Sequence, residues 1–351
     1  MTRVVGVDPG TESIDVCGIV DGQLYLDQSW PTAEAVSDPA AFIQLLTAAG
    51  LPDLVVGPSG YGLPLKSARE VTEADLRLAF LAPPNESGGI GGLRKLARML
   101  GDSGLPVIYV PGVIHLDTVP EHRKLNRVDL GTADKLCAAA LGIHEQCRRR
   151  DREPEESSFI LVELGGAFTA GVAVERGQIV DGIGGTSGPI GWRAAGALDG
   201  EVAYLAGQID KSALFQGGIT TLLEGAPQRR AIAAEAYIEG AVKTVRQLRC
   251  SAKSADEILV SGRHASDPQI LDRMTAELAD VGPVRLLAGS AAHAKQGAEG
   301  AALLADGLVG GVNQTLVDRL RIREAHGTVL DNLVFIRPEA ARRRLGIDDR
   351  R

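Results

Sequence analysis

The sequence is poor in aromatic residues and cysteine, and it has no long apolar run. Only 4% of its 351 residues are aromatic, so Ala, Val, Leu and Ile must fill the core, as in helices packed on buried sheets. The four cysteines form no CxxC pair and have no histidine at metal-ligand spacing, which argues against a zinc or disulfide framework. No apolar stretch approaches the about 18 residues of a membrane span, and no signal-peptide pattern opens the chain. We therefore expect a cytoplasmic protein.

Positive charge is also scarce. Lys and Arg number 37 against 45 Asp and Glu, and the resulting formal net charge of −8 argues against a nucleic-acid or anionic-membrane partner. Two common nucleotide signatures are missing as well. No GxxxxGK[ST] occurs, which excludes a P-loop, and no GxGxxG follows a predicted strand. The length favours about two domains.

Two glycine-bearing hairpin patterns, at residues 3–20 and 159–186, carry most of the information. Each opens with an apolar β-run, meets an acidic residue (Asp8 or Glu163), makes a glycine-containing turn and returns as a second apolar run. A turn rich in backbone N–H groups with a carboxylate at its mouth suits the phosphates of a nucleotide and their Mg²⁺. Either pattern alone is equally typical of an ordinary hairpin. Their recurrence in the same sequential context suggests a nucleotide held between two similar halves.

The residues of these turns have distinct expected roles. Gly10 permits a positive φ, and Thr11 offers a hydroxyl and an N–H to a phosphate. Gly165 and Gly166 repeat the arrangement in the second hairpin. The acids of the two hairpins would hold Mg²⁺ through water.

The order of predicted elements repeats along the chain, as strand–strand–strand–helix. Asp38 is a candidate helix N-cap followed by Pro39. We expect strands at residues 4–7, 14–20, 23–30, 54–56, 107–110, 160–164, 170–174, 178–180, 258–260 and 284–287, and helices at 38–49, 93–100, 129–142, 227–248, 267–278 and 296–308. Residues 148–158 are a predicted charged linker, and the charged stretch 322–351 is expected to be partly mobile.

A second group of candidates lies outside the hairpins. The turn at residues 258–263 could admit the flat face of adenine at Gly262 and Arg263, or simply connect a strand to a helix. The basic residues that could meet a transferring phosphoryl group are Arg193, Arg263, Arg94 and Lys66, although most such residues are solvated surface charges. Arg193 stands out because its surroundings are dense in glycine.

Two aspartates flank the glycine-threonine lead-in to a predicted helix. Asp129 or Asp134 could accept a proton from a substrate, or could simply cap the helix. The helix at 296–308 is lined with glycine and alanine, which permits close packing on another helix.

This ordered set resembles the actin, sugar kinase and heat-shock chaperone ATPase superfamily. There a first phosphate hairpin, a connecting helix, a second phosphate hairpin, an adenosine turn and a second connecting helix follow in order. Their counterparts here are residues 4–20, 129–142, 160–174, 258–263 and 296–308. The resemblance implies an α/β fold of two ribonuclease H-like lobes with a nucleotide cleft between them. The N-terminal lobe would comprise residues 1–128 plus 292–351, and the C-terminal lobe residues 129–291.

Within that superfamily the chain resembles the predicted butyrate kinase family. PSGYGLP (58–64), DLGTADK (129–135) and GALDGE (196–201) carry that closer match. The resemblance implies Mg·ATP as phosphoryl donor, a small carboxylate acceptor and a homodimer. Ser59, Gly60 and Tyr61 would shape the acceptor pocket, and Arg193 would stabilise the transferred group.

The chain departs from acetate and butyrate kinases at three places. Those enzymes usually have Asn where this chain has Asp8, and they have Asp, Asn or His where it has Glu163. Their adenosine turn carries a double glycine in place of Gly262 and Arg263. The fold and the ATP site therefore transfer better than the substrate does. Two alternatives stay open: a hydroxyl-acceptor kinase with Asp129 or Asp134 as base, and an ATP-dependent switch that controls a partner.

Overall fold

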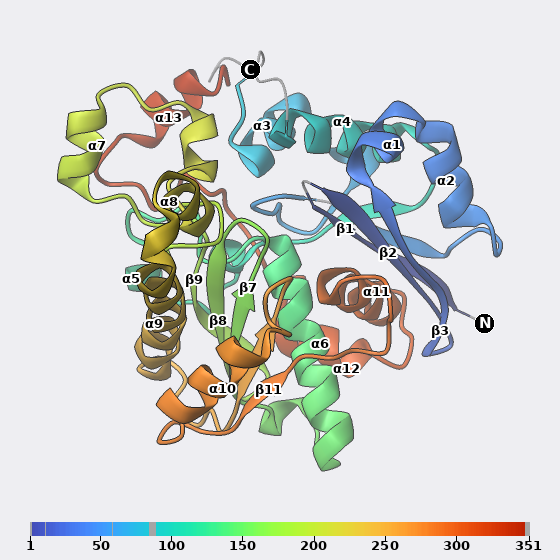
Figure 1. Ribbon diagram of the computed structural model, residues 1–351. Helices are drawn as coiled ribbons and strands as arrows, with labels where there is room; N and C mark the ends of the chain where they lie inside the picture. Colours follow the sequence, from blue (N-terminus) through green and yellow to red (C-terminus); the bar gives the residue numbers. More distant parts are fainter. Residues whose placement is uncertain (1, 11, 58, 84–88, 348–351) are drawn as a thin grey trace.

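The computed structural model describes residues 2–10, 12–57, 59–83 and 89–347. Two β-sheets form the cores of two lobes, with long helices between and around them (Figure 1). The first sheet has the order β3-β2-β1-β4-β6-β5 and the second the order β11-β10-β7-β8-β9. The strands of the first sheet are β1 (Arg3–Pro9), β2 (Ser13–Val20), β3 (Gln23–Pro31), β4 (Leu54–Gly57), β5 (Lys66–Ser67) and β6 (Val107–Tyr109). Those of the second are β7 (Phe159–Leu164), β8 (Thr169–Glu175), β9 (Gln178–Ile183), β10 (Ile258–Ser261) and β11 (Val284–Leu286).

The two sheets repeat one topology. In each, three antiparallel strands (β3-β2-β1 or β9-β8-β7) are followed by two strands that run parallel to the first strand of the repeat (β4 and β6, or β10 and β11). The match extends to details of the hairpins. Both second turns place two successive residues at positive φ, and both sheets have a register shift at the same point of the second hairpin. Such turns follow the right-handed twist of a hairpin. The expected duplicated α/β fold is therefore confirmed.

Helices cover both faces of each sheet. Their bounds are α1 Thr32–Ser37, α2 Pro39–Thr47, α3 Glu73–Phe80, α4 Gly89–Asp102, α5 Glu121–Lys124, α6 Ala133–Arg150, α7 Gly200–Ala206, α8 Ile219–Gly225, α9 Arg230–Arg249, α10 Pro268–Glu277, α11 Gln296–Leu308, α12 Gln314–Leu320 and α13 Pro338–Arg344. Helices α6 and α11 lie between the sheets, and α9 covers the outer face of the second sheet (Figure 1).

Strand alternation decides which way the hairpin acids point. In β1, Val5 and Val7 belong to the outer core, whereas Val4 belongs to the core shared with α6 and α11. Because side chains alternate along a strand, Asp8 also faces the central layer. The same alternation in β7 places Leu161 and therefore Glu163 on the inner side.

The central helices approach each other very closely. A Cβ at Gly300 of α11 would overlap the carbonyl oxygen of Cys137 in α6. A Cβ at Gly6 of β1 would likewise overlap the backbone of α11 at Ala298 and Ala302. The close packing predicted from the small residues of this helix is confirmed, and it places the ends of α6 and α11 beside the hairpin turns.

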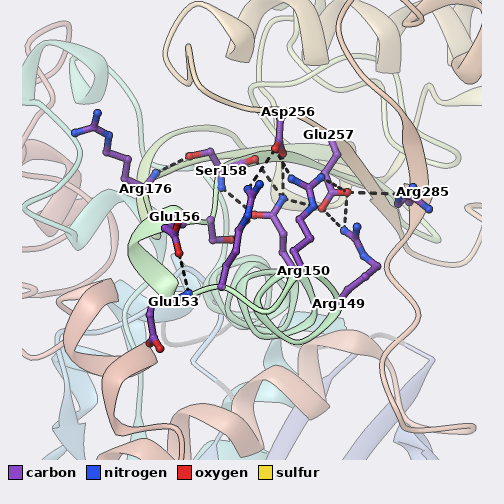
Figure 2. Close-up of polar contacts among 12 residues, drawn as sticks. Arg149, Arg150, Glu153, Glu156, Ser158, Arg176, Asp256, Glu257 and Arg285 are labelled. Carbon is purple, nitrogen blue, oxygen red and sulfur yellow. Dashed lines mark hydrogen bonds and ion pairs between the residues drawn. The ribbon is translucent and has the colours of Figure 1, made fainter.

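The stretch at residues 148–158, expected as a charged linker, is folded. Helix α6 continues to Arg150, and a short 3₁₀ turn (Pro154–Glu156) leads into β7. Its arginines attach this end of the helix to the second sheet. Figure 2 shows Arg149, Arg150 and Arg285 converging on the fully buried carboxylate of Glu257. A buried charge needs such partners, because desolvation alone would disfavour it.

The charged C-terminal stretch, predicted to be partly mobile, is anchored to the core at several points up to residue 347. Six of its apolar side chains are buried in the core around α6 and α11, namely Ile322, Ala325, Val329, Leu330, Leu345 and Ile347. Because these residues are irregularly spaced, helix or strand periodicity in the sequence does not predict that they are buried. Within the described residues, no helix is both long and apolar enough to cross a membrane.

Candidate functional site

The two hairpin turns have the same hydrogen-bonded form. The Gly10 N–H donates to the carbonyl oxygen of Ser13 (2.8 Å), and the Gly165 N–H donates to that of Phe168 (3.0 Å). These two amides close the turns, so they are not available to bind phosphates. The prediction that they would donate to phosphates is therefore wrong. Gly10 is also not at positive φ. The turn requires glycine at position 10 for lack of space, because a Cβ there would lie 2.7 Å from the Ser13 carbonyl oxygen and 3.0 Å from the Lys295 ammonium.

A cavity of about 280 Å³ lies between the two hairpins. Three of the described candidates, Asp129, Lys66 and Arg94, do not line it, and Thr11 lies outside the described ranges. The other predicted site residues do line it. They are Asp8, Gly10, Ser59, Gly60, Tyr61, Asp134, Glu163, Gly165, Gly166, Arg193, Gly262 and Arg263. Glycines and acids from both halves of the duplication thus meet at one place.

A largely buried ammonium group joins the acid at the start of α6 to the acid of the second hairpin, both in the C-terminal lobe. The Lys135 Nζ lies 2.6 Å from Asp134 Oδ2 and 2.8 Å from Glu163 Oε1. Burial raises the pKa of Asp134, but the Lys135 ammonium and a hydrogen bond from Thr132 lower it further, so the net shift is downward. Asp134 therefore stays ionised and is a poor proton acceptor.

Asp8 has a different environment. Within the described residues no hydrogen bond or ion pair engages its carboxylate, which is 8% exposed and faces the start of α11. A Cβ at Gly297 would lie 2.7 Å from Asp8 Oδ2, so this glycine makes room for the carboxylate. Burial and the nearby Asp134 charge raise the pKa of Asp8 to about 7. A divalent cation would reverse that shift by favouring the charged form.

A second ammonium, from Lys295, lies on the N-terminal side of the cleft. It contacts the buried Asp15 carboxylate at 2.5 Å and the Ser13 hydroxyl at 2.8 Å. Since Asp15 pairs with Asp8 across the β1–β2 ladder, Lys295 ties the loop before α11 to this hairpin.

Two arginines from the C-terminal lobe reach Glu12 in the first hairpin. Arg263 Nη1 lies 2.5 Å from Glu12 Oε2, and Arg193 Nη1 lies 3.6 Å from Oε1. Arg193 Nε also donates to the Gly166 carbonyl oxygen at 3.2 Å. The other two basic candidates lie elsewhere: Lys66 pairs with Asp75 beside a separate cavity, and Arg94 donates to the Pro83 carbonyl oxygen on the N-terminal lobe.

The loop after β4 forms one wall of the cavity. The Ser59 hydroxyl donates to the Val110 carbonyl oxygen at 3.0 Å, and the Gly60 carbonyl accepts the Ala133 N–H at the start of α6. Burial raises the pKa of Tyr61, which keeps its phenol protonated. Apolar side chains complete this side of the cavity, namely Phe80, Leu93, Val110, Phe168 and Phe215.

The turn after β10 requires glycine at its first position. Gly262 has φ +94°, and a Cβ there would lie 2.5 Å from the Leu164 carbonyl oxygen. The next residues turn away from each other: Arg263 reaches across to Glu12, and the His264 ring stacks on Trp192 with centroids 4.0 Å apart.

Asp129, the other candidate base, does not line the cavity. Its buried carboxylate accepts hydrogen bonds from the Gly131 N–H and from the N–H and hydroxyl of Thr186. It therefore holds the entry to α6 against the loop after β9, which is a structural role.

Comparison with known proteins identifies the family of this sequence. The model of the DUF1464 family, described as a protein of unknown function, matches residues 6–335. The chain belongs to the DUF1464 family. A search of curated protein sequences found no match to this chain.

Solved structures share the fold of this DUF1464 protein. A propionate kinase from Francisella tularensis is 13% identical with a TM-score of 0.59, over 86% of this chain and 99% of that one. An acetate kinase from Entamoeba histolytica is 12% identical with a TM-score of 0.56, over 80% and 87% of the two chains. An acetate kinase from Porphyromonas gingivalis is 12% identical with a TM-score of 0.55, over 80% and 88%. Together with the repeated sheet topology, they show the duplicated actin-like ATPase fold.

Several residues of the cavity were not singled out from the sequence. They are Glu12, Lys135, Phe168, Phe215 and Lys295, the last of which pairs with Asp15 outside the lining. Lys135 directly follows Asp134, so a search for charges beside the connecting helix could have found it. The contacts of Glu12, Phe215 and Lys295 depend on how distant segments meet, which leaves no local pattern.

Proposed function

We propose that the protein is an ATP-dependent phosphotransferase that transfers the γ-phosphoryl group of Mg·ATP to a short carboxylate such as butyrate. The observation that carries this proposal is the pair of equivalent hairpins, each with a carboxylate at its mouth, that open on one cavity between two lobes.

The residues present fit Mg²⁺ and the phosphates. Mg²⁺ is usually held by one or two carboxylates together with substrate phosphates. Asp8 offers a carboxylate without an ammonium partner among the described residues, and Glu163 offers a second on the opposite wall. Within the described residues no three acidic, histidine or cysteine side chains gather into a metal site of their own. This agrees with an ion that arrives with the nucleotide.

The nucleotide would lie along the hairpins and the turn after β10. Gly10 and Gly165, which have no side chains, would let phosphates approach the turns, Thr11 would offer them a hydroxyl and an N–H, and the Gly166 N–H would face them. Gly262 would lie against adenine. Mg·ATP would supply the phosphoryl group and the divalent charge. Arg193 and Arg263, once released from Glu12, would neutralise the oxygens of the transferred group.

The charge state of Asp134 favours a carboxylate acceptor. A hydroxyl acceptor needs a base, and Asp134, the one of the two candidate bases that lines the cavity, is made a weaker base by the Lys135 ammonium, which lowers its pKa. A short carboxylate is already ionised near neutral pH, because its pKa lies roughly between 4 and 5. The wall formed by Ser59–Tyr61 and the neighbouring phenylalanines suits a small apolar tail.

Trapping of the acyl phosphate as hydroxamate tests this proposal. The protein is incubated with Mg·ATP, hydroxylamine and one short carboxylic acid at a time. We expect hydroxamate with one acid or a narrow set of acids, and its loss in Asp8→Ala. Lys66→Met, which removes a cation outside the cleft, serves as control. Wild-type protein that binds ATP but yields no hydroxamate with any acid would overturn the choice of a carboxylate acceptor. Turnover that persists in Asp8→Ala would overturn the role of Asp8.

A further inference from the structure

Lys135 occupies an unusual position for a cation. It lies in the first turn of α6, where the helix dipole disfavours positive charge, so helix stability does not explain it. Its side chain is 16% exposed and lines the cavity between the hairpins. The chain enters α6 through Gly131 at φ +127°, a conformation that brings the start of this helix up to the second hairpin.

The ammonium lies between the acid beside it on α6 and the acid of the second hairpin. It is 2.6 Å from Asp134 and 2.8 Å from Glu163, and its charge also acts on Asp8. Burial disfavours its charge, but the Asp134 and Glu163 carboxylates raise the pKa of Lys135 well above its usual value. It is therefore a permanent positive charge and donates hydrogen bonds only.

We propose that Lys135 is a further catalytic residue, whose ammonium contacts the oxygens of the phosphoryl group during transfer. The inference rests on the proposed function. An acceptor carboxylate oxygen forms a bond to the γ-phosphorus as the bond from that phosphorus to the bridging oxygen of ADP breaks. The electron pair leaves with ADP, and no proton moves because the acceptor is ionised. Lys135 keeps its protons and neutralises charge on the equatorial oxygens.

The competing explanation is that Lys135 only neutralises Glu163 and Asp134. The two roles differ in which ligand senses the ammonium. A contact with the transferred group exists with ATP and is missing with ADP, whereas a purely structural ion pair supports both nucleotides equally. The two roles also predict different behaviour when both Lys135 and Glu163 are replaced. Lys135→Met alone leaves the Glu163 carboxylate buried without its ammonium partner, which destabilises the protein, and adding Glu163→Gln removes that unpaired charge.

The experiment measures melting temperature, ATP and ADP affinity by calorimetry, and the rate of acyl phosphate formation. The variants are Lys135→Met, Lys135→Arg, Glu163→Gln, Lys135→Met combined with Glu163→Gln, and the control Lys66→Met. In Lys135→Met we expect ATP affinity to fall by about 10-fold or more, ADP affinity by less than about 3-fold, and turnover by about 100-fold. We expect Lys135→Arg to recover part of the turnover. The double variant should regain melting temperature. Because Glu163 is itself placed at the Mg²⁺ site, its turnover is compared with that of Glu163→Gln alone, below which we expect a further fall of about 10-fold or more.

Equal losses for ATP and ADP, or a double variant with the turnover of Glu163→Gln alone, would overturn the role of Lys135. If Lys135→Met does not fold, the ATP-to-ADP affinity ratio of Lys135→Arg and of the double variant decides, and a ratio equal to that of the wild type overturns it. A wild type that binds neither nucleotide would instead overturn the proposed function. The two failures are thus distinguishable, because the first requires a wild type that binds ATP.

Discussion

Asp8 is buried, and no ion pair among the described residues involves its carboxylate. Its folded-state pKa is about 7, against an ordinary value of 3.8, because burial and the Asp134 charge disfavour the carboxylate. A group whose pKa is raised on folding destabilises the protein where it must ionise. Below about pH 4 the carboxyl is protonated in both states, and the penalty then grows with pH until it is complete above about pH 7.

We expect Asp8→Asn to stabilise the protein at pH 8 and to lose this advantage as the pH falls toward 5. One pKa unit corresponds to about 1.4 kcal/mol, so the shift of about three units sets an upper bound of about 4 kcal/mol. Thermal melts at several pH values measure the effect. Asp272→Asn, at an exposed position of α10, is the control. Equal melting temperatures for Asp8→Asn and the wild type at pH 8 would contradict the assignment.

At the scale of elements, the crossing of α6 and α11 depends on a residue without a side chain. Because a Cβ at Gly300 would overlap the Cys137 carbonyl oxygen, even alanine must push the helices apart. Alanine is otherwise favoured over glycine in a helix interior by about 1 kcal/mol. The sign of the effect therefore separates close packing from intrinsic helix propensity.

We expect Gly300→Ala to lower the free energy of unfolding by about 1–3 kcal/mol, measured by urea denaturation. Gly225→Ala, at the end of α8 where a Cβ would meet nothing within 4 Å, should leave it unchanged or raise it slightly. A stabilised Gly300→Ala variant would show that the two helices can separate without cost.

At the scale of the whole molecule, side chains bridge the two lobes across the cleft. Glu12 of the first hairpin pairs with Arg193 and Arg263 of the C-terminal lobe. Lys211, from the segment between α7 and α8, donates to the Phe80 and Leu81 carbonyl oxygens of the N-terminal lobe. Glu12 thus engages both arginines. Under the proposed function, nucleotide binding would exchange this carboxylate for phosphate oxygens.

We expect Glu12→Gln to bind ATP more tightly than the wild type, because the amide competes less for the arginines. All three side chains are partly exposed, so solvent screening limits the gain to roughly 1 kcal/mol, or about 5-fold. Calorimetry at low and high salt measures it, and the gain should shrink as salt is added. Unchanged or weaker ATP binding at low salt would show that Glu12 does not compete with the ligand.

The sequence predicts the locally encoded parts of this architecture well. Strand alternation and turn glycines identify both hairpins, and Asp38 caps α2 at the expected place by accepting the Ala41 N–H. The same alternation predicts which face of each sheet the acids at the hairpin mouths occupy. These features need only neighbouring residues, so periodicity and turn chemistry reveal them.

Contacts between distant segments could not be predicted in the same way. Lys66 and Arg94 were candidates together with Arg193 and Arg263, yet only the latter two of these four line the cavity, since the fold decides which surface each element presents. The Gly10 and Gly165 amides looked free until the turns that consume them were visible. The pairing of Lys135 with Glu163 depends on how the start of α6 packs against the second hairpin, which the sequence does not show.

The packing of α11 on β1 has a consequence for how the chain is made. Helix α11 covers the inner face of the first sheet, and its Gly297 makes room for Asp8. The ribosome produces β1, β2 and β4 long before this helix emerges. The inner face of these strands therefore stays exposed while the entire C-terminal lobe is synthesised. The first lobe to be translated is the last to be completed, and during that interval it is a natural client for chaperones.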